Sequence, residues 1–308
     1  MRIDAHQHFW TYDSEQYAWI TPALGEIRRD FGPADLAPLL DAAALDGSIA
    51  VQARSCEAET RELLALAHAS WASGPEHPSG RPDVHPVVRP IFGVVGWLDL
   101  AADDFEAALD RYAADPLLVG LRHIVQDEPD DRFLDRADFR RGVRALARRG
   151  LVYDVLVYPR QLPAAIDFAA ALEDAPLVLD HCAKPPLRAG SGSPEWAAWE
   201  RGLRALARCP NVTCKVSGLV TEADWQAWRP EDILRAIDVA LAAFGPERVI
   251  FGSDWPVALL AAPYAAVYEL TERAFAGHSA AERAAFFGGN ARRVYGAERG
   301  RLVPSSAP

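Results

Sequence analysis

Imidazole and carboxylate side chains stand where short apolar segments of this sequence end. The segment 3–9 carries His6 and His8, which are separated by one residue, and the segment 249–255 carries Asp254. Side chains alternate along an extended strand, so His6 and His8 should point to the same side. If these groups met Asp254, they could bind a divalent cation such as Zn²⁺ or move protons to and from a water molecule.

Two other apolar segments end in the same way. Residues 118–125 contain Arg122 and His123, and residues 177–183 contain His181. A single histidine at such a place is more often structural than functional. Several of them at matching ends of different strands are hard to explain separately, because each would need its own buried hydrogen-bond partner.

The segments that carry these residues recur with a regular order. Short apolar runs rich in β-branched residues occupy 3–9, 48–53, 91–100, 118–125, 151–157, 177–183, 212–218 and 249–255. Stretches with helical periodicity lie between them, at 33–46, 57–73, 103–114, 138–149, 162–173, 195–208 and 231–244. Apolar strands that alternate with helices predict a parallel sheet that is covered by the helices.

Eight such units predict an α/β protein, a single-domain (β/α)₈ TIM barrel over residues 1–296, followed by a frayed tail at 297–308. In this fold the active site lies at the C-terminal ends of the strands, which is where the polar residues occur. No glycine-rich nucleotide-binding motif follows any of the expected strands.

Composition excludes several classes of protein. The 308 residues are 50% hydrophobic and 24% charged, as in a globular protein, and the net charge of −11 argues against nucleic acid as a partner. There is no run of about 18 apolar residues and no signal-peptide pattern, so we expect a cytoplasmic protein without membrane contact. The four cysteines have no metal-binding spacing. A homo-oligomer is compatible with these data.

Ordered motifs along nearly the whole chain resemble one family. They are IDAHQHFW (3–10), GLRHIVQDEPD (120–130), DHCAKP (180–185), GSDWPV (252–257) and GNARRVYG (289–296). Together they resemble the amidohydrolase superfamily, of the amidohydrolase 2 type, and within it the sugar-acid lactonase branch. The resemblance implies hydrolysis of a small aldono-1,4- or 1,5-lactone, of the L-fucono- or L-rhamnono-lactone type, to the hydroxy acid.

Lactone hydrolysis needs a nucleophilic water, a polarised carbonyl and a proton for the leaving oxygen. Asp254 is the expected base, although the same carboxylate could instead cap the next segment. His181 matches a catalytic histidine of the resembled family and should contact the carbonyl or the attacking water. The side chains expected to bind substrate are Arg122, His123, Lys184, Trp10 and Trp255.

Structural roles remain open for several of these residues. Arg122 could pair with a barrel acid such as Asp4 or Asp154 in place of substrate, and Lys215 could pair with Asp180. Trp19 also adjoins a strand-end motif, but core packing is the simpler expectation for it.

A metal site could form from His6, His8 and Asp254. Metal-bearing members of the resembled superfamily add a histidine from the fifth strand, and residues 151–158 contain none. If Asp254 must stay free as a base, the site is one protein ligand short. The substrate carbonyl could therefore be polarised either by a required Zn²⁺ or by cationic side chains, and the sequence leaves both alternatives open.

Two other functions fit the same sequence. One is a metal-dependent decarboxylase or hydratase of a small carboxylated compound. The other is a catalytically silent barrel that binds a ligand, although ionisable groups without partners in a barrel mouth argue against it.

Overall fold

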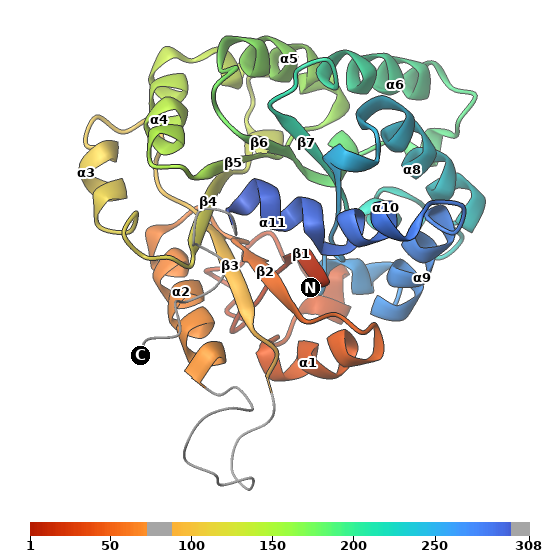
Figure 1. The fold of residues 1–308 in the computed structure, drawn as a ribbon, viewed down its shortest axis with the longest axis horizontal. Coiled ribbons are helices and arrows are strands. Elements are labelled where there is room, and N and C mark those ends of the chain that lie inside the picture. Colours follow the sequence, from red (N-terminus) through yellow and green to blue (C-terminus); the bar gives the residue numbers. More distant parts are fainter. Residues whose placement is uncertain (73–87, 297–308) are drawn as a thin grey trace, which may run out of the picture.

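Eight parallel strands form a ring around the centre of the protein (Figure 1). The computed structural model describes residues 1–72 and 88–296. The strands are β1 (Ile3–Gln7), β2 (Gly47–Val51), β3 (Ile91–Gly96), β4 (Leu118–His123), β5 (Val152–Val155), β6 (Leu177–Leu179), β7 (Val212–Val216) and β8 (Val249–Phe251). Each strand pairs with the next one along the chain. All of the predicted strands are confirmed, with shorter bounds.

The ring closes between β1 and β8, just beyond the end of β8. The main-chain N–H of His8 donates to the carbonyl of Trp255 at 2.7 Å, and the N–H of Asp254 donates to the carbonyl of His6 at 2.8 Å. The predicted (β/α)₈ barrel is thus confirmed. Its closing hydrogen bonds involve the residues that were singled out for their chemistry.

Most of the helices surround the ring (Figure 1). The described helices are α1 (Pro33–Ala42), α2 (Glu57–Ala72), α3 (Phe105–Asp110), α4 (Ala137–Arg148), α5 (Leu162–Ala171), α6 (Pro194–Leu206), α7 (Leu219–Glu222), α8 (Pro230–Phe244), α9 (Tyr264–Ala274), α10 (Ala280–Ala284) and α11 (Asn290–Tyr295). The seven predicted helices are present, but α7 and α9 to α11 were missed. No helix within the described ranges is both long and apolar enough to cross a membrane.

Local sequence explains where α8 begins and ends. Pro230 occupies its first turn, where the missing N–H costs no hydrogen bond, and Glu231 and Asp232 place negative charge beside the positive end of the helix dipole. Gly245 follows the last residue with a φ of 72°. Its missing Cβ lets the chain turn away from the helix toward β8.

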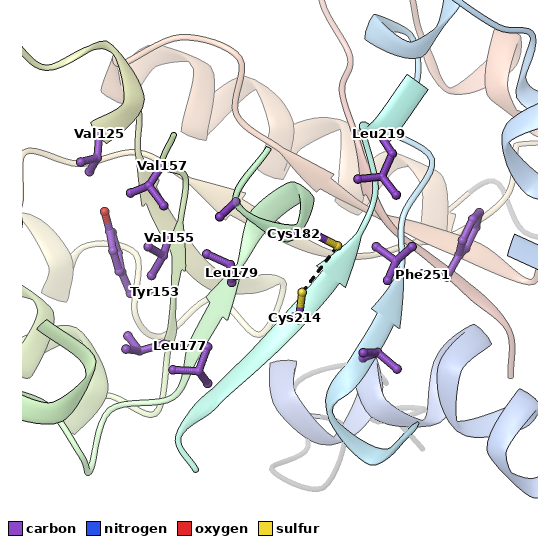
Figure 2. Packing of buried hydrophobic residues seen from close by; sticks show 14 of the residues in the cluster. Val125, Tyr153, Val155, Val157, Leu177, Leu179, Cys182, Cys214, Leu219 and Phe251 are labelled. Atoms are coloured by element: carbon purple, nitrogen blue, oxygen red, sulfur yellow. Dashed lines mark hydrogen bonds between the residues drawn. The ribbon is translucent and has the colours of Figure 1, made fainter. Parts of the chain in front are cut away.

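Two apolar layers hold the barrel together. Tyr153, Val155 and Leu179 face outward from β5 and β6 and pack under the helices (Figure 2). A second cluster fills the interior and includes Ile3 of β1. Near the centre of the ring in Figure 1, α11 contributes Tyr295 to this inner cluster. The predicted tail at 297–308 lies outside the described residues.

Candidate active site

His6 and His8 reach the barrel interior at the end of β1, where the pairing with β2 shifts register between Asp4 and Gln7. Both histidines are buried. The His8 Nδ1 lies 2.8 Å from the main-chain carbonyl of Val51. A carbonyl only accepts hydrogen bonds, so Nδ1 must carry the proton and Nε2 keeps its lone pair.

Asp254 faces both imidazoles. Its Oδ1 lies 3.4 Å from the Nε2 of His8 and 3.7 Å from the Nε2 of His6. The N–H of Ala258 donates to the main-chain carbonyl of Asp254, so the next segment begins without help from the carboxylate. The predicted convergence of the strand-one histidines and the strand-eight aspartate is therefore present.

Charges around Asp254 set its ionisation. Burial by itself raises the pKa of this carboxyl, but the neighbouring imidazoles of His181, His8 and His6 lower it, and the net pKa lies below the usual value. Asp254 is an anion at neutral pH. Burial holds the pKa of His6 well below its ordinary value, so that imidazole is neutral.

His181 sits in an unusual backbone turn that follows β6. The φ values of residues 181–184 are 53°, 51°, 54° and 53°, so four consecutive residues are left-handed. None of them is glycine, and this conformation costs an L-residue roughly 1–2 kcal/mol. Such strain persists only where surrounding structure enforces it, and it often marks a functional site. The turn places the ring of His181 4.5 Å from that of His6.

Ser217 and Gly218 support His181 from the end of β7. The Oγ of Ser217 lies 2.8 Å from the Nδ1 of His181. A Cβ on Gly218 would lie 2.5 Å from that Nδ1 and 2.8 Å from the Oδ2 of Asp254, so only glycine leaves room for both groups. Burial lowers the pKa of His181 to about 4, which keeps it neutral at neutral pH. Sequence reasoning did not single out Gly218.

A buried charge network lies below these groups. The Nζ of Lys215 is 2.7 Å from Asp154 and 2.9 Å from Asp180, which confirms the predicted pairing of Lys215 with Asp180. Asp180 also accepts a hydrogen bond from Arg122 at 2.9 Å and lies 3.3 Å from the Nδ1 of His6. Burial raises the pKa of Asp180, but Lys215, His6 and Arg122 outweigh it and hold the pKa well below its ordinary value.

A cavity of about 330 Å³ opens above the network. It is lined by His8, Trp19, Ala53, Arg122, Ile124, Gln126, Asp127, Leu156, His181, Lys184, Thr221, Asp254 and Val257. The structure thus brings Arg122 and Lys184 together with the predicted catalytic residues. Arg122 pairs with Asp180, and not with Asp4 or Asp154 as the sequence had suggested. Lys184 is held by Glu222 at 2.8 Å.

Three of the predicted substrate residues lie elsewhere. His123 hydrogen-bonds Glu128 at 2.7 Å and stacks on Phe133, on the outer side of β4. Trp255 is 2% exposed and packs in the core, and Trp10 borders a separate hollow of about 870 Å³ beside α2. That hollow is larger, but neither His181 nor Asp254 lines it, so it is not the candidate active site.

Trp19 was expected in the core, and that expectation is wrong. Its side chain is 39% exposed and lines the cavity that contains Asp254. Gln126, Asp127 and Thr221 also line it and were not predicted as site residues. Gln126 and Asp127 directly follow the expected strand at 118–125, which is the signal that could have identified them.

The donor set fits a divalent cation. His6, His8 and Asp254 each offer one ligand atom, and these atoms lie within 4.8 Å of one another. Separations of 3.4 and 3.7 Å are close to the spacing of ligands that share a tetrahedral Zn²⁺ with bonds of about 2.1 Å. The fixed tautomer of His8 presents Nε2, as a metal ligand must.

Known proteins are similar to this chain in sequence and in fold. The sequence matches the amidohydrolase family over residues 3–297. It is 46% identical to a Burkholderia multivorans protein named L-fucono-1,5-lactonase, with 96% of both chains covered. A Burkholderia ambifaria protein of the same name is 38% identical, with 97% of this chain and 96% of that one covered. A crystal structure of an amidohydrolase from Burkholderia multivorans with bound Zn has a TM-score of 0.87 and 45% identity, and covers 96% of this chain and 99% of that one. By sequence and by fold, this chain belongs to the amidohydrolase family.

Proposed function

We propose that this protein hydrolyses a small sugar-acid lactone to its hydroxy acid. The observation that carries the proposal is the convergence of a buried anion, Asp254, with the neutral imidazoles of His6 and His181 beside a cavity of about 330 Å³. The similarity to two proteins named L-fucono-1,5-lactonase supports it. The net charge of −11 favours a small molecule over nucleic acid as the partner.

In this proposal Asp254 accepts a proton from the attacking water and later returns it to the ring oxygen as the ester bond breaks. The Oγ of Ser217 donates to the Nδ1 of His181, so that the opposite ring nitrogen can donate to the carbonyl oxygen as negative charge develops there. Arg122 and Lys184 bind oxygen atoms of the substrate and favour its anionic transition state.

We propose a deoxy-sugar lactone of the L-fucono type as the substrate. Ile124, Leu156 and Val257 offer an apolar surface to its methyl group, while Asp127 can accept hydrogen bonds from hydroxyl groups. The exposed face of Trp19 can pack on the C–H side of the sugar ring.

A divalent cation, with Zn²⁺ as the first candidate, would be held by His6, His8 and Asp254. When bound, it supplies positive charge that polarises the carbonyl and lowers the pKa of a water molecule. The bound Zn in the similar Burkholderia multivorans structure supports this assignment. We propose that the cation is not strictly required, because Arg122 and Lys184 already bring positive charge to the cavity.

A panel of aldono-1,4- and 1,5-lactones, followed with a pH indicator, tests the proposal. We expect acid release from L-fucono- or L-rhamnono-type lactones without release of CO₂, and substantial activity after dialysis against a chelator. Inactivity on the whole panel, with or without Zn²⁺, or CO₂ release from a carboxylated compound would refute the lactonase assignment. Activity that is lost on chelation and restored by one equivalent of Zn²⁺ would refute only the proposal that the cation is not required.

A further inference from the structure

Arg122 points an N–H group at the nitrogen that a metal ion would need. Its Nη1 lies 3.3 Å from the Nε2 of His6, and that same Nε2 is the His6 nitrogen that faces Asp254, at 3.7 Å, in the candidate metal site. The residue is only 3% exposed, so water does not screen this contact effectively.

The His6 ring has one lone pair to offer. Its Nδ1 faces the Oδ1 of Asp180 at 3.3 Å, and a carboxylate anion attracts the N–H form of that nitrogen. The lone pair is then on Nε2, where it accepts the hydrogen bond from Arg122. A cation would need the same lone pair, so the guanidinium and the cation are alternatives at this atom.

Arg122 is also held in place. Its Nη1 donates to Asp180 at 2.9 Å, and its Nη2 donates to the main-chain carbonyl of Gln52. A guanidinium group does not lose its proton in a protein. A divalent cation bound to His6 would therefore meet a fixed positive charge at short range in a buried site, where like charges repel strongly.

We propose that Arg122 weakens divalent-cation binding at the site formed by His6, His8 and Asp254. It does so by occupying the lone pair of His6 and by its charge. The guanidinium then provides the positive charge at this place in the metal-free protein. This inference concerns cation affinity and does not depend on which lactone, if any, is hydrolysed.

Cation affinity can be measured directly. Purified metal-free protein is titrated with Co²⁺, whose visible absorption reports tetrahedral binding, and with Zn²⁺ against a chromophoric chelator. Arg122→Met should bind both ions at least about tenfold more tightly than the wild type, the lower end of the changes caused by residues that contact metal ligands. Lys184→Met is the control, because it also removes a positively charged side chain from the cavity, one that pairs with Glu222. It should change the affinity for both ions by less than about threefold, since Lys184 is not placed against the Nε2 of His6.

Affinity in Arg122→Met that is equal to or weaker than in the wild type would overturn the proposal. An equal gain in cation affinity in Arg122→Met and Lys184→Met would also overturn it. The gain would then come from the loss of a positive charge in general and not from competition for the lone pair of His6. If the methionine variant does not fold, as judged by circular dichroism, Arg122→Gln replaces it. Glutamine is neutral and can still donate to Asp180, and the same two outcomes decide.

Discussion

Substituting Gly218 with alanine tests whether the end of β7 positions the catalytic groups. Gly218 has a φ of 60° and a ψ of 14°, a left-handed conformation that alanine adopts at a cost of roughly 1–2 kcal/mol. The new Cβ would also lie 2.5 Å from the Nδ1 of His181 and 2.8 Å from the Oδ2 of Asp254. The substitution removes no polar group and no charge.

The size of the effect follows from these distances. Non-bonded heavy atoms settle at about 3.5 Å or more, so His181 or Asp254 must move by about 1 Å. A displacement of that size can cost roughly a hundredfold in rate. We expect Gly218→Ala to lose about that much in kcat/KM, equivalent to about 2.7 kcal/mol of transition-state stabilisation. The free energy of unfolding should fall by only about 1–2 kcal/mol from the backbone conformation.

Steady-state lactonase kinetics and urea unfolding together measure both effects. Gly245→Ala is the control for backbone strain, because its φ of 72° with a ψ of 164° is also unfavourable for alanine and no atom lies within 4 Å of the added Cβ. The control should lose stability but keep its activity. The hypothesis that Gly218 positions the catalytic groups by leaving them room is wrong if Gly218→Ala keeps more than about a third of the wild-type kcat/KM. It is also wrong if Gly245→Ala loses as much activity as Gly218→Ala.

Three further predictions concern Asp254 and His181. Asp254→Asn should keep the fold but lose nearly all turnover, because an amide cannot accept the proton from water. A variant that keeps more than about a tenth of the wild-type kcat, which is a barrier increase below about 1.4 kcal/mol, would contradict the role of Asp254 as base. His181→Asn should lower kcat about a hundredfold with little change in KM, and an effect on KM alone would show that it only binds substrate. The folded pKa of His181 is about 4 and its usual value is 6.5, so below about pH 6.5 the unfolded chain takes up a proton that the folded protein does not. This contribution to stability is complete above pH 6.5 and should be lost by pH 4. Urea unfolding should therefore show the wild type losing about 3 kcal/mol relative to His181→Asn over this range.

Much of the barrel could be predicted because its strands are short apolar runs with turn residues between them. The helices that were missed carry weaker signals. In α11 the sequence NARRVY has few apolar residues, and the role of Tyr295 depends on Asp154, a residue far away in sequence. Periodicity reports one face of one helix, so it cannot reveal such a contact.

The site was predictable where it depends on strand alternation and on ordered motifs. His6, His8, His181 and Asp254 come from strand ends, and parallel strands in a ring bring those ends together. The positions of His123 and Trp19 depend on loop conformation instead. The left-handed turn at 181–184 was beyond sequence reasoning, since residues of ordinary type adopt it only under tertiary constraint.

Closure of the ring between β1 and β8 has a consequence for biosynthesis. His6 and His8 leave the ribosome early, whereas Asp254 emerges only after most of the barrel has been made. Tyr295, which donates to the buried Asp154, comes later still. Contacts between such distant residues close long loops and are typical of slow folding steps. We therefore expect the nascent chain to gain its active site in the last stage of folding, when β8 completes the ring and α11 supplies Tyr295.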